Sequence, residues 1–287
     1  MLVLETDEAH PDTESERGSF GDIFDQLFKQ AGDKHDPPLG IETVIRFIVE
    51  NEGGKVPALD DFKRGEFEDI HAILITGSMY DAHGGDEWIL KLVKLIQGWC
   101  WVHHSQARRH ISNPCSGLWT ERPEMRFSGV CFGHQVLCRA LGSKIEPTPG
   151  EKWELAHTEI KLSPVGEKLF KKSGSIHLHQ MHQDHVVNGP SPSTTDLLPE
   201  DTPAHVWGSS ETTKIQGVYL PKRLFTSQGH LGFDEKMVKR QIEMRVESGG
   251  IKDLDQAEAA KKTADMEHDG ESVASAILRF FHGDDAL

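Results

Sequence analysis

The segment Arg126-Phe-Ser-Gly-Val-Cys-Phe-Gly-His-Gln-Val-Leu-Cys-Arg-Ala-Leu-Gly142 predicts a buried strand, a sharp turn and a helix in immediate succession. Residues 127–130 form a short apolar run, and residues 135–141 repeat apolar side chains at helical spacing. Cys131 stands between them with Gly129 and Gly133 close by, as a strained strand-to-helix reversal requires small neighbours. This pattern is typical of a nucleophile elbow.

The elbow predicts a reactive sulfur. The side chain of Cys131 would project from the carboxyl edge of the sheet, where the positive end of the following helix favours thiolate over thiol. The amides of the same turn could bind an oxyanion. The alternative is that Cys131 is a buried structural cysteine, which is how most free cysteines behave and how we interpret Cys138.

Length and composition limit the classes of function. A chain of 287 residues can form one large α/β domain or two smaller ones. The 46 acidic and 31 basic residues give a formal charge of -15, which argues against nucleic acid or an anionic membrane as the main partner. Four cysteines without a C-x-x-C pair indicate neither a disulfide framework nor a structural zinc site. We expect a cytoplasmic protein that binds a small polar metabolite.

Further strands are predicted on both sides of the elbow. Residues 2–4, 41–49 and 69–80 read as buried strands, and the first two of these are separated by an amphipathic helix that begins near Ser19. The third strand ends at Thr76-Gly-Ser78. In a parallel sheet this turn would share an edge with Cys131, so the amide of Gly77 could be a second oxyanion donor beside that of Phe132. An ordinary loop is the alternative.

Two segments are unusual in composition. Residues 98–120 contain no Asp or Glu but hold three Trp, two Cys and three His, and we interpret them as an insertion. A substrate lid or a partner surface is one hypothesis for it, and a non-essential loop is another. Residues 175–186 hold four histidines and an aspartate. A metal site is conceivable there, but polar lining of a pocket fits the spacing better, with the candidates His182, Asp184 and His185.

A base is needed if Cys131 is a nucleophile, because an imidazole must accept the thiol proton and return it to the leaving nitrogen. The run Arg223-Leu-Phe-Thr-Ser-Gln-Gly-His230 predicts a strand that ends in glycine and histidine. His230 is therefore the candidate. Helices follow at 233–247, 257–264 and 272–281.

Taken together, these motifs resemble the class I glutamine amidotransferases, most closely the stand-alone fungal-type members. The resemblance rests on Gly129-Val-Cys-Phe-Gly-His-Gln135, Thr76-Gly-Ser78, Gln180-Met-His-Gln-Asp-His-Val186 and Ser227-Gln-Gly-His230, in that order, and covers about residues 1–245. It implies an α/β three-layer sandwich with a flavodoxin-like, mostly parallel sheet and helices on both faces. We expect such a domain over residues 1–248 and a helical extension over 249–287.

The resemblance also implies a chemistry. A cysteine, a histidine and a glutamate remove the amide nitrogen of glutamine as ammonia through a γ-glutamyl thioester, without a cofactor. Cys131 carries over as nucleophile, His230 as base, Gly77 and Phe132 as oxyanion donors, and Gln135 as a contact to the amino-acid end of the substrate.

One departure concerns the glutamate. The family pattern places Pro-Glu after the histidine, whereas this chain has Leu231 and Gly232. Loss of the orienting acid is expected to slow such a triad without abolishing it. The resemblance therefore implies an amidase that passes ammonia to a separate synthetase, for instance in secondary metabolism. The alternatives are a γ-glutamyl peptide hydrolase and a non-catalytic binding protein.

Overall fold

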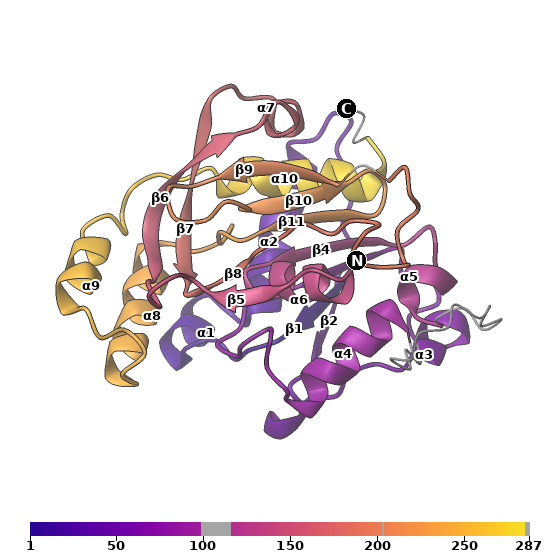
Figure 1. Cartoon of the computed structure of the whole chain (residues 1–287), viewed down its shortest axis with the longest axis horizontal. Coiled ribbons are helices and arrows are strands. Elements are labelled where there is room, and N and C mark those ends of the chain that lie inside the picture. The colour runs from indigo at the N-terminus through magenta and orange to yellow at the C-terminus, as the bar shows by residue number, and fades with distance from the viewer. Residues whose placement is uncertain (99–115, 203, 285–287) are drawn as a thin grey trace.

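A nine-stranded sheet runs through the centre of the molecule in the computed structural model, which describes residues 1–98, 116–202 and 204–284 (Figure 1). Five strands are parallel, in the order β2 (Val44–Phe47), β1 (Leu2–Glu5), β3 (Ala72–Ile75), β4 (Arg126–Val130) and β11 (Leu224–Ser227). The sheet continues antiparallel through β10 (Gly217–Leu220), β9 (His205–Ser209), β6 (Glu154–Leu162) and β7 (Ser175–His182). A separate small sheet pairs β5 (Ile145–Pro147) with β8 (Asp184–Val186).

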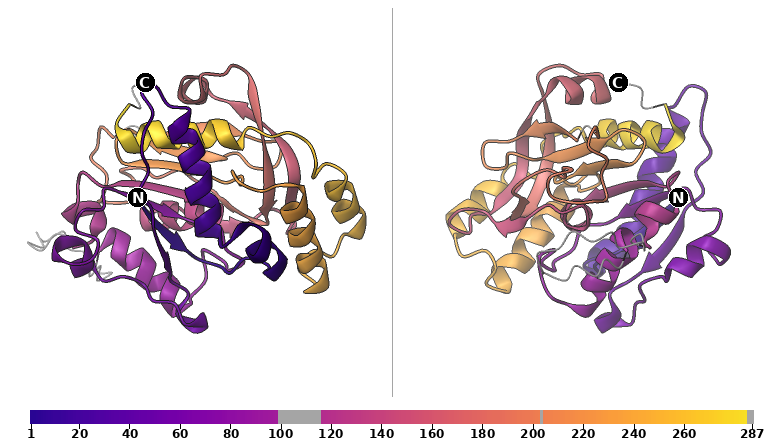
Figure 2. Two further views of the ribbon diagram at one scale, coloured as in Figure 1. Left: turned by 180° about the vertical axis from the view of Figure 1, so that it is seen from behind. Right: turned by 45° about the vertical axis from the view of Figure 1, so that its right-hand side comes forward.

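Helices cover both faces of the sheet (Figure 2). On one face lie α2 (Phe20–Asp33) and α10 (Gly270–His282), and on the other α4 (Glu87–Gln97) and α6 (Phe132–Ala140). Strand β1 shows why two layers are needed, because Leu2 and Leu4 pack into the core of α4 and α6 while Val3 packs into that of α2 and α10. The flavodoxin-like three-layer sandwich is therefore confirmed, with an antiparallel extension on one side.

The remaining helices lie around this body, and their bounds are α1 (Pro11–Arg17), α3 (Leu59–Arg64), α5 (Leu118–Glu121), α7 (Pro164–Phe170), α8 (Glu235–Glu247) and α9 (Leu254–Lys261), with a 3-10 turn η1 (Glu50–Glu52). Helices α8 and α9 form a third apolar core with Met181 of β7 and Ile23 of α2. Both α9 and α10 fall in the segment 249–287, which we expected to be a helical extension. The side chains of Val273, Ile277 and Phe280 in α10 are completely buried.

Local signals place several of these elements correctly. Helix α2 begins after Ser19, whose hydroxyl accepts the amide of Asp22 while the Asp22 carboxylate accepts the amide of Ser19. Most of the expected insertion at 98–120 lies outside the described residues.

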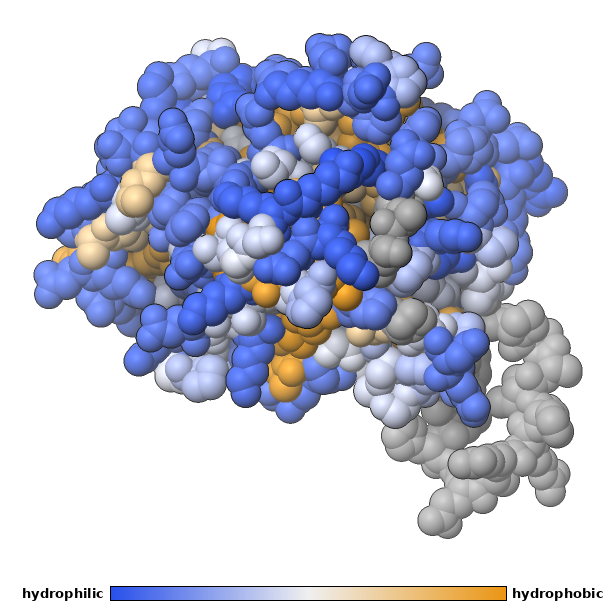
Figure 3. All heavy atoms as spheres, turned by 90° about the horizontal axis from the view of Figure 1, so that it is seen from above, coloured by the Kyte–Doolittle hydropathy of each residue, from blue (hydrophilic) through white to orange (hydrophobic). Residues whose placement is uncertain are grey.

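No helix in the described part of the chain is both long and apolar enough to span a bilayer. Seen from above, the molecule is hydrophilic over most of its surface (Figure 3).

Candidate active site

Cys131 stands at the turn between β4 and α6 in a strained backbone conformation, with φ 52° and ψ -108°. Its amide donates a hydrogen bond to the carbonyl of Ser227 at 2.9 Å, which ties the turn to the end of β11. The two neighbouring glycines are needed sterically. A β-carbon at Gly129 would overlap the backbone of Gly133, and one at Gly133 would overlap the carbonyl of Ile75.

His230 reaches the same place from the loop after β11. Its amide donates to the carbonyl of His179 at 2.8 Å, and its ring stacks on Phe233 with centroids 3.9 Å apart and planes 15° apart. A β-carbon built on Gly77 would lie 2.9 Å from Cε1 of His230 and 3.5 Å from Cβ of Cys131. The structure thus brings the predicted nucleophile and base together around Gly77.

Burial keeps both groups neutral in the unliganded site. It raises the pKa of the Cys131 thiol to about 12, although the amide of Phe132 and the charge of Arg245 act in the opposite direction. Burial also lowers the pKa of His230 to about 3, with further lowering by His182 and His179. The neutral thiol differs from the thiolate that the helix N-terminus alone would favour. Because Cys131 is only 5% exposed, the cost of burying a charge outweighs the effect of the helix dipole.

No carboxylate occupies the position of the family's glutamate. A β-carbon at Gly232 would lie 2.8 Å from Cγ2 of Ile23, so α2 packs closely against this residue. The next acid, Asp234, accepts the amide of Met237 at 2.9 Å and pairs with Arg17 at 2.8 Å. Among the described residues, Nε2 of His230 is buried without a hydrogen-bond partner. His230 is therefore held by the hydrogen bond from its backbone amide to His179 and by stacking of its ring on Phe233.

The two candidate oxyanion residues, Gly77 and Phe132, both lie next to Cys131. The amide of Phe132 faces the sulfur of Cys131. The turn that carries Gly77 is fixed from β1, because the hydroxyl of Thr6 donates to the carbonyl of Gly77 at 3.0 Å and Ser78 donates to the carbonyl of Thr6 at 2.6 Å. Such preorganised amides can stabilise a tetrahedral oxyanion.

Two cavities meet at Cys131. The narrower one, of about 40 Å³, includes His230 and Gly77 and is otherwise mostly apolar, with side chains of Phe20, Ile23, Phe24, Phe233 and Met237. The wider one, of about 170 Å³, is lined by polar groups that include Gln135, His182 and Asp184. Five residues belong to both cavities: Ser78, Met79, Cys131, Met181 and Arg245.

Gln135 and Asp184 are linked in the polar cavity. The amide of Gln135 donates to the carbonyl of Asp184 at 2.9 Å and to the side chain of Gln228 at 3.1 Å. The carboxylate of Asp184 lies 3.0 Å from Nδ1 of His83, and burial raises its pKa. Asp184 therefore lines the wall of the cavity with its carboxylate next to His83, and the amide nitrogen of Gln135 already serves neighbouring groups.

The predicted histidines are engaged differently. Both ring nitrogens of His182 have partners, the carbonyl of Asp184 at 2.9 Å and the carboxylate of Glu154 at 2.9 Å. His185 lines neither of the two cavities at Cys131. The segment 175–186 thus supplies Met181, His182, Gln183 and Asp184 to the site, and His182 is fixed there by the buried Glu154.

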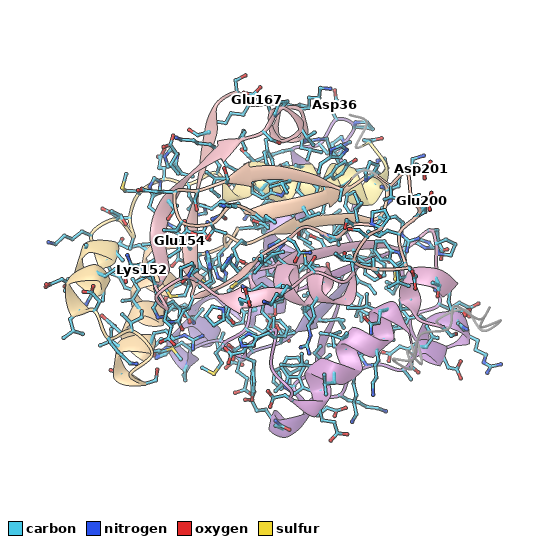
Figure 4. All side chains as sticks on the ribbon, viewed as in Figure 1. Asp36, Lys152, Glu154, Glu167, Glu200 and Asp201 are labelled. Atoms are coloured by element: carbon cyan, nitrogen blue, oxygen red, sulfur yellow. The ribbon has the colours of Figure 1, made fainter. Side chains whose placement is uncertain are left out.

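Sequence reasoning missed Glu154, Phe233 and Arg245. Glu154, which is labelled in Figure 4, is only 6% exposed. Its Oε2 accepts hydrogen bonds from Thr213 at 2.8 Å and from Gln216 at 3.0 Å, and it lies 2.9 Å from Nε2 of His182. Glu154 lies far in the sequence from both Cys131 and His230, and Arg245 belongs to a long surface helix without a motif. Only Phe233 could have been suspected, because it follows His230 by three residues.

The chain is similar to known proteins in sequence and in fold. Residues 120–242 match the family model described as glutamine amidotransferase class-I. The chain is 26% identical to a protein of Schizosaccharomyces pombe named as glutamine amidotransferase-like, over 98% of this chain and 97% of the relative. It is 28% identical to a protein of Saccharomyces cerevisiae named as a glutamine amidotransferase, over 98% of this chain and 96% of that relative.

More distant relatives and solved structures extend the comparison. Gamma-glutamyl peptidase 5 of Arabidopsis thaliana is 26% identical over 86% of this chain and 80% of its own length. A solved glutamine amido transferase from Methylobacillus flagellatus matches with a TM-score of 0.62 at 15% identity, over 98% of this chain and 93% of that chain. A solved glutamine amidotransferase from Thermotoga maritima matches with a TM-score of 0.58 at 15% identity, covering 98% of both chains. The chain is therefore similar to the class I glutamine amidotransferases, in sequence over residues 120–242 and in fold over nearly its whole length.

Proposed function

We propose that this protein cleaves γ-glutamyl amide bonds, with Cys131 as nucleophile and His230 as base. The observation that carries the proposal is the meeting of both side chains at Gly77, at the junction of a polar and an apolar cavity. A nucleophile on a strained elbow beside an imidazole suits acyl transfer.

The proposed reaction has two steps. The sulfur of Cys131 attacks the γ-carbonyl carbon while its proton passes to His230, which is consistent with two neutral groups in the free site. The oxyanion is bound by the amides of Gly77 and Phe132. The C–N bond then breaks, and the leaving amine takes the proton from His230. Water hydrolyses the resulting thioester, with the imidazole now accepting a proton from the water.

The polar cavity would hold the amino-acid end of the substrate. Its carboxylate at Asp184 suits an α-ammonium group. Gln135 and His182 would act mainly by holding Asp184, because both contact its carbonyl. His185 would have at most an indirect role.

The leaving group separates two versions of this function. With glutamine, the product is ammonia, which a separate synthetase subunit would consume, for instance in a secondary-metabolite pathway. With a γ-glutamyl peptide, the product is a larger amine. The apolar side chains around His230 favour the second version, because they offer contact area to a leaving group larger than ammonia, while Asp7 and Gln241 add polar groups to the same cavity. The names of the Arabidopsis relatives point the same way.

One assay tests the function and its versions. Purified protein is incubated with glutamine and with γ-glutamyl dipeptides, and released ammonia, amine and glutamate are measured. We expect release that Cys131→Ala abolishes and that Cys138→Ala preserves, since Cys138 is buried in α6 away from both cavities. Release in neither case would instead support a binding protein that keeps the fold. Equal release by the Cys131→Ala variant would refute the nucleophile.

A further inference from the structure

Arg245 is the cation shared by the two cavities at Cys131. It lies near the carboxyl end of α8, beyond the segment 120–242 that matches the family model. We propose that Arg245 forms a carboxylate-binding subsite, which recognises an anionic group of the substrate beside the nucleophile. The proposal rests on the proposed function for the identity of the substrate.

In the described parts of the chain the guanidinium of Arg245 makes no ion pair, although the protein has 46 acidic residues. The carboxylate of Asp7 lines the narrower cavity with Arg245 and interacts with its charge over a longer distance. Each oxygen of Asp7 accepts one backbone amide, from Met79 at 2.7 Å and from Glu8 at 2.9 Å. A half-buried arginine at a cleft with free donors is suited to an external anion.

Trp153 holds this arginine in place. The guanidinium carbon lies 5.6 Å from the centre of the Trp153 ring, which is within the range of a cation–π contact. The ring itself is fixed, because its indole nitrogen donates to the carbonyl of Gly250 at 3.0 Å and its carbonyl accepts from Gln256 at 2.9 Å. Trp153 and Gly250 also line the polar cavity. The donor is thus held in position before a ligand arrives.

The chemistry that fits is a carboxylate, because the planar fork of arginine can donate two parallel hydrogen bonds to it. A γ-glutamyl compound offers two sources. The α-carboxylate belongs to the glutamyl part and is present in glutamine, whereas a terminal carboxylate belongs only to a peptide leaving group. Arg245 borders the cavities on both sides of Cys131, so either source is within the same subsite.

Binding to the Cys131→Ala protein tests the subsite without requiring turnover. Dissociation constants are measured by calorimetry for glutamine, for a γ-glutamyl dipeptide and for the same dipeptide with an amidated terminus. We expect Arg245→Leu to weaken binding about tenfold or more, and Arg245→Lys to restore part of it. An equal loss for all three ligands assigns the α-carboxylate, and a loss confined to the free-acid dipeptide assigns the terminal one.

Arg240→Leu is the matched control, because Arg240 lies on the same helix but pairs with Glu16 at 3.0 Å. It should leave all three constants unchanged. The proposal is overturned if Arg245→Leu binds as tightly as its parent, if both arginine variants weaken binding equally, or if the parent binds none of the ligands. If the ligands bind tightly and in an Arg245-dependent manner but the protein with Cys131 intact shows no turnover, the subsite is retained and only the proposed catalysis is refuted.

Discussion

Gly77 separates the thiol of Cys131 from the imidazole of His230, and its lack of a side chain is what lets the two approach. Gly77→Ala would place a β-carbon 2.9 Å from the ring of His230. We expect kcat/KM for γ-glutamyl substrates to fall about 10²-fold, because a displacement of about 1 Å in a catalytic group has an effect of this size. The measurement is steady-state kinetics with circular dichroism as a check on folding.

Gly85→Ala provides the comparison for that variant. A β-carbon at Gly85 would meet no atom within 4 Å, so the substitution should change neither activity nor fold. If Gly77→Ala were as active as the wild-type protein, the imidazole of His230 could not be the base that acts on Cys131 from the position next to Gly77.

The single-residue features were predictable to different degrees. The strained turn at Cys131 could be predicted because Gly129 and Gly133 lie within two residues of it in the sequence and the turn is local. His230 followed only from its place at the end of a strand. The contributions of Phe233 and Arg245 could not be predicted, because they depend on how α8 packs against β7 and on Trp153, a contact with no local pattern.

At the scale of elements, Glu154 joins the hairpin of β6 and β7 to the loop before β10. It contacts His182, Thr213 and Gln216, and its pKa is lowered to about 2 by hydrogen bonds and the charge of His182, which together exceed the effect of burial. We expect Glu154→Gln to lower the free energy of unfolding by about 1–3 kcal/mol, since buried hydrogen bonds to a charged group are lost. Urea unfolding at pH 7 measures the difference.

The pH dependence of that variant gives an independent check. A carboxyl with a lowered pKa stabilises the fold above its unfolded value of 4.5 and loses this effect as the pH falls toward 2. The gap between wild type and Glu154→Gln should therefore shrink below pH 4.5. Glu159→Gln, on the exposed face of the same strand, should match the wild type throughout. A constant gap across this range would exclude a charged Glu154.

The elements themselves were largely predictable from apolar periodicity. Strands β1, β3 and β4 are short buried runs, and α2 and α4 have clear apolar faces. Helix α1 was overlooked because it buries only Thr13 and owes its start to Pro11 and to a cap from His10. Helix α7, whose start is marked by Ser163 and Pro164, buries Gly166, Leu169 and Phe170 but is too short to show a clear helical period.

At the scale of the whole molecule, burial holds five histidines neutral among the residues that the structure describes. Their pKa values are lowered, to about 3 for His134 and His230, to about 4 for His179, and by smaller amounts for His185 and His268. The unfolded chain binds protons at these sites below about pH 6.5, while the folded chain does not, so stability must fall as the pH decreases from 6.5 toward 4.

Two carboxyl groups oppose this trend without reversing it. Burial raises the pKa of Asp7 to about 6 and that of Asp184 in the same direction, so both favour the folded state as the pH falls. With five sites against two, we expect the melting temperature to decrease steadily between pH 7 and pH 5. A melting temperature that stays constant or rises over this interval would show that the histidines are not buried as neutral groups.

The most direct test of the central claim is peptide mapping by mass spectrometry after exposure to a glutamine-like electrophile. The account predicts one adduct, at Cys131, which forms about 10²-fold more slowly in a His230→Asn variant because the imidazole no longer takes the thiol proton. A neutral alkylating agent without a glutamyl group should react slowly with both proteins, since the free thiol has a pKa of about 12. An adduct at Cys138 in place of Cys131, or equal rates with and without His230, would contradict the proposed pairing of nucleophile and base.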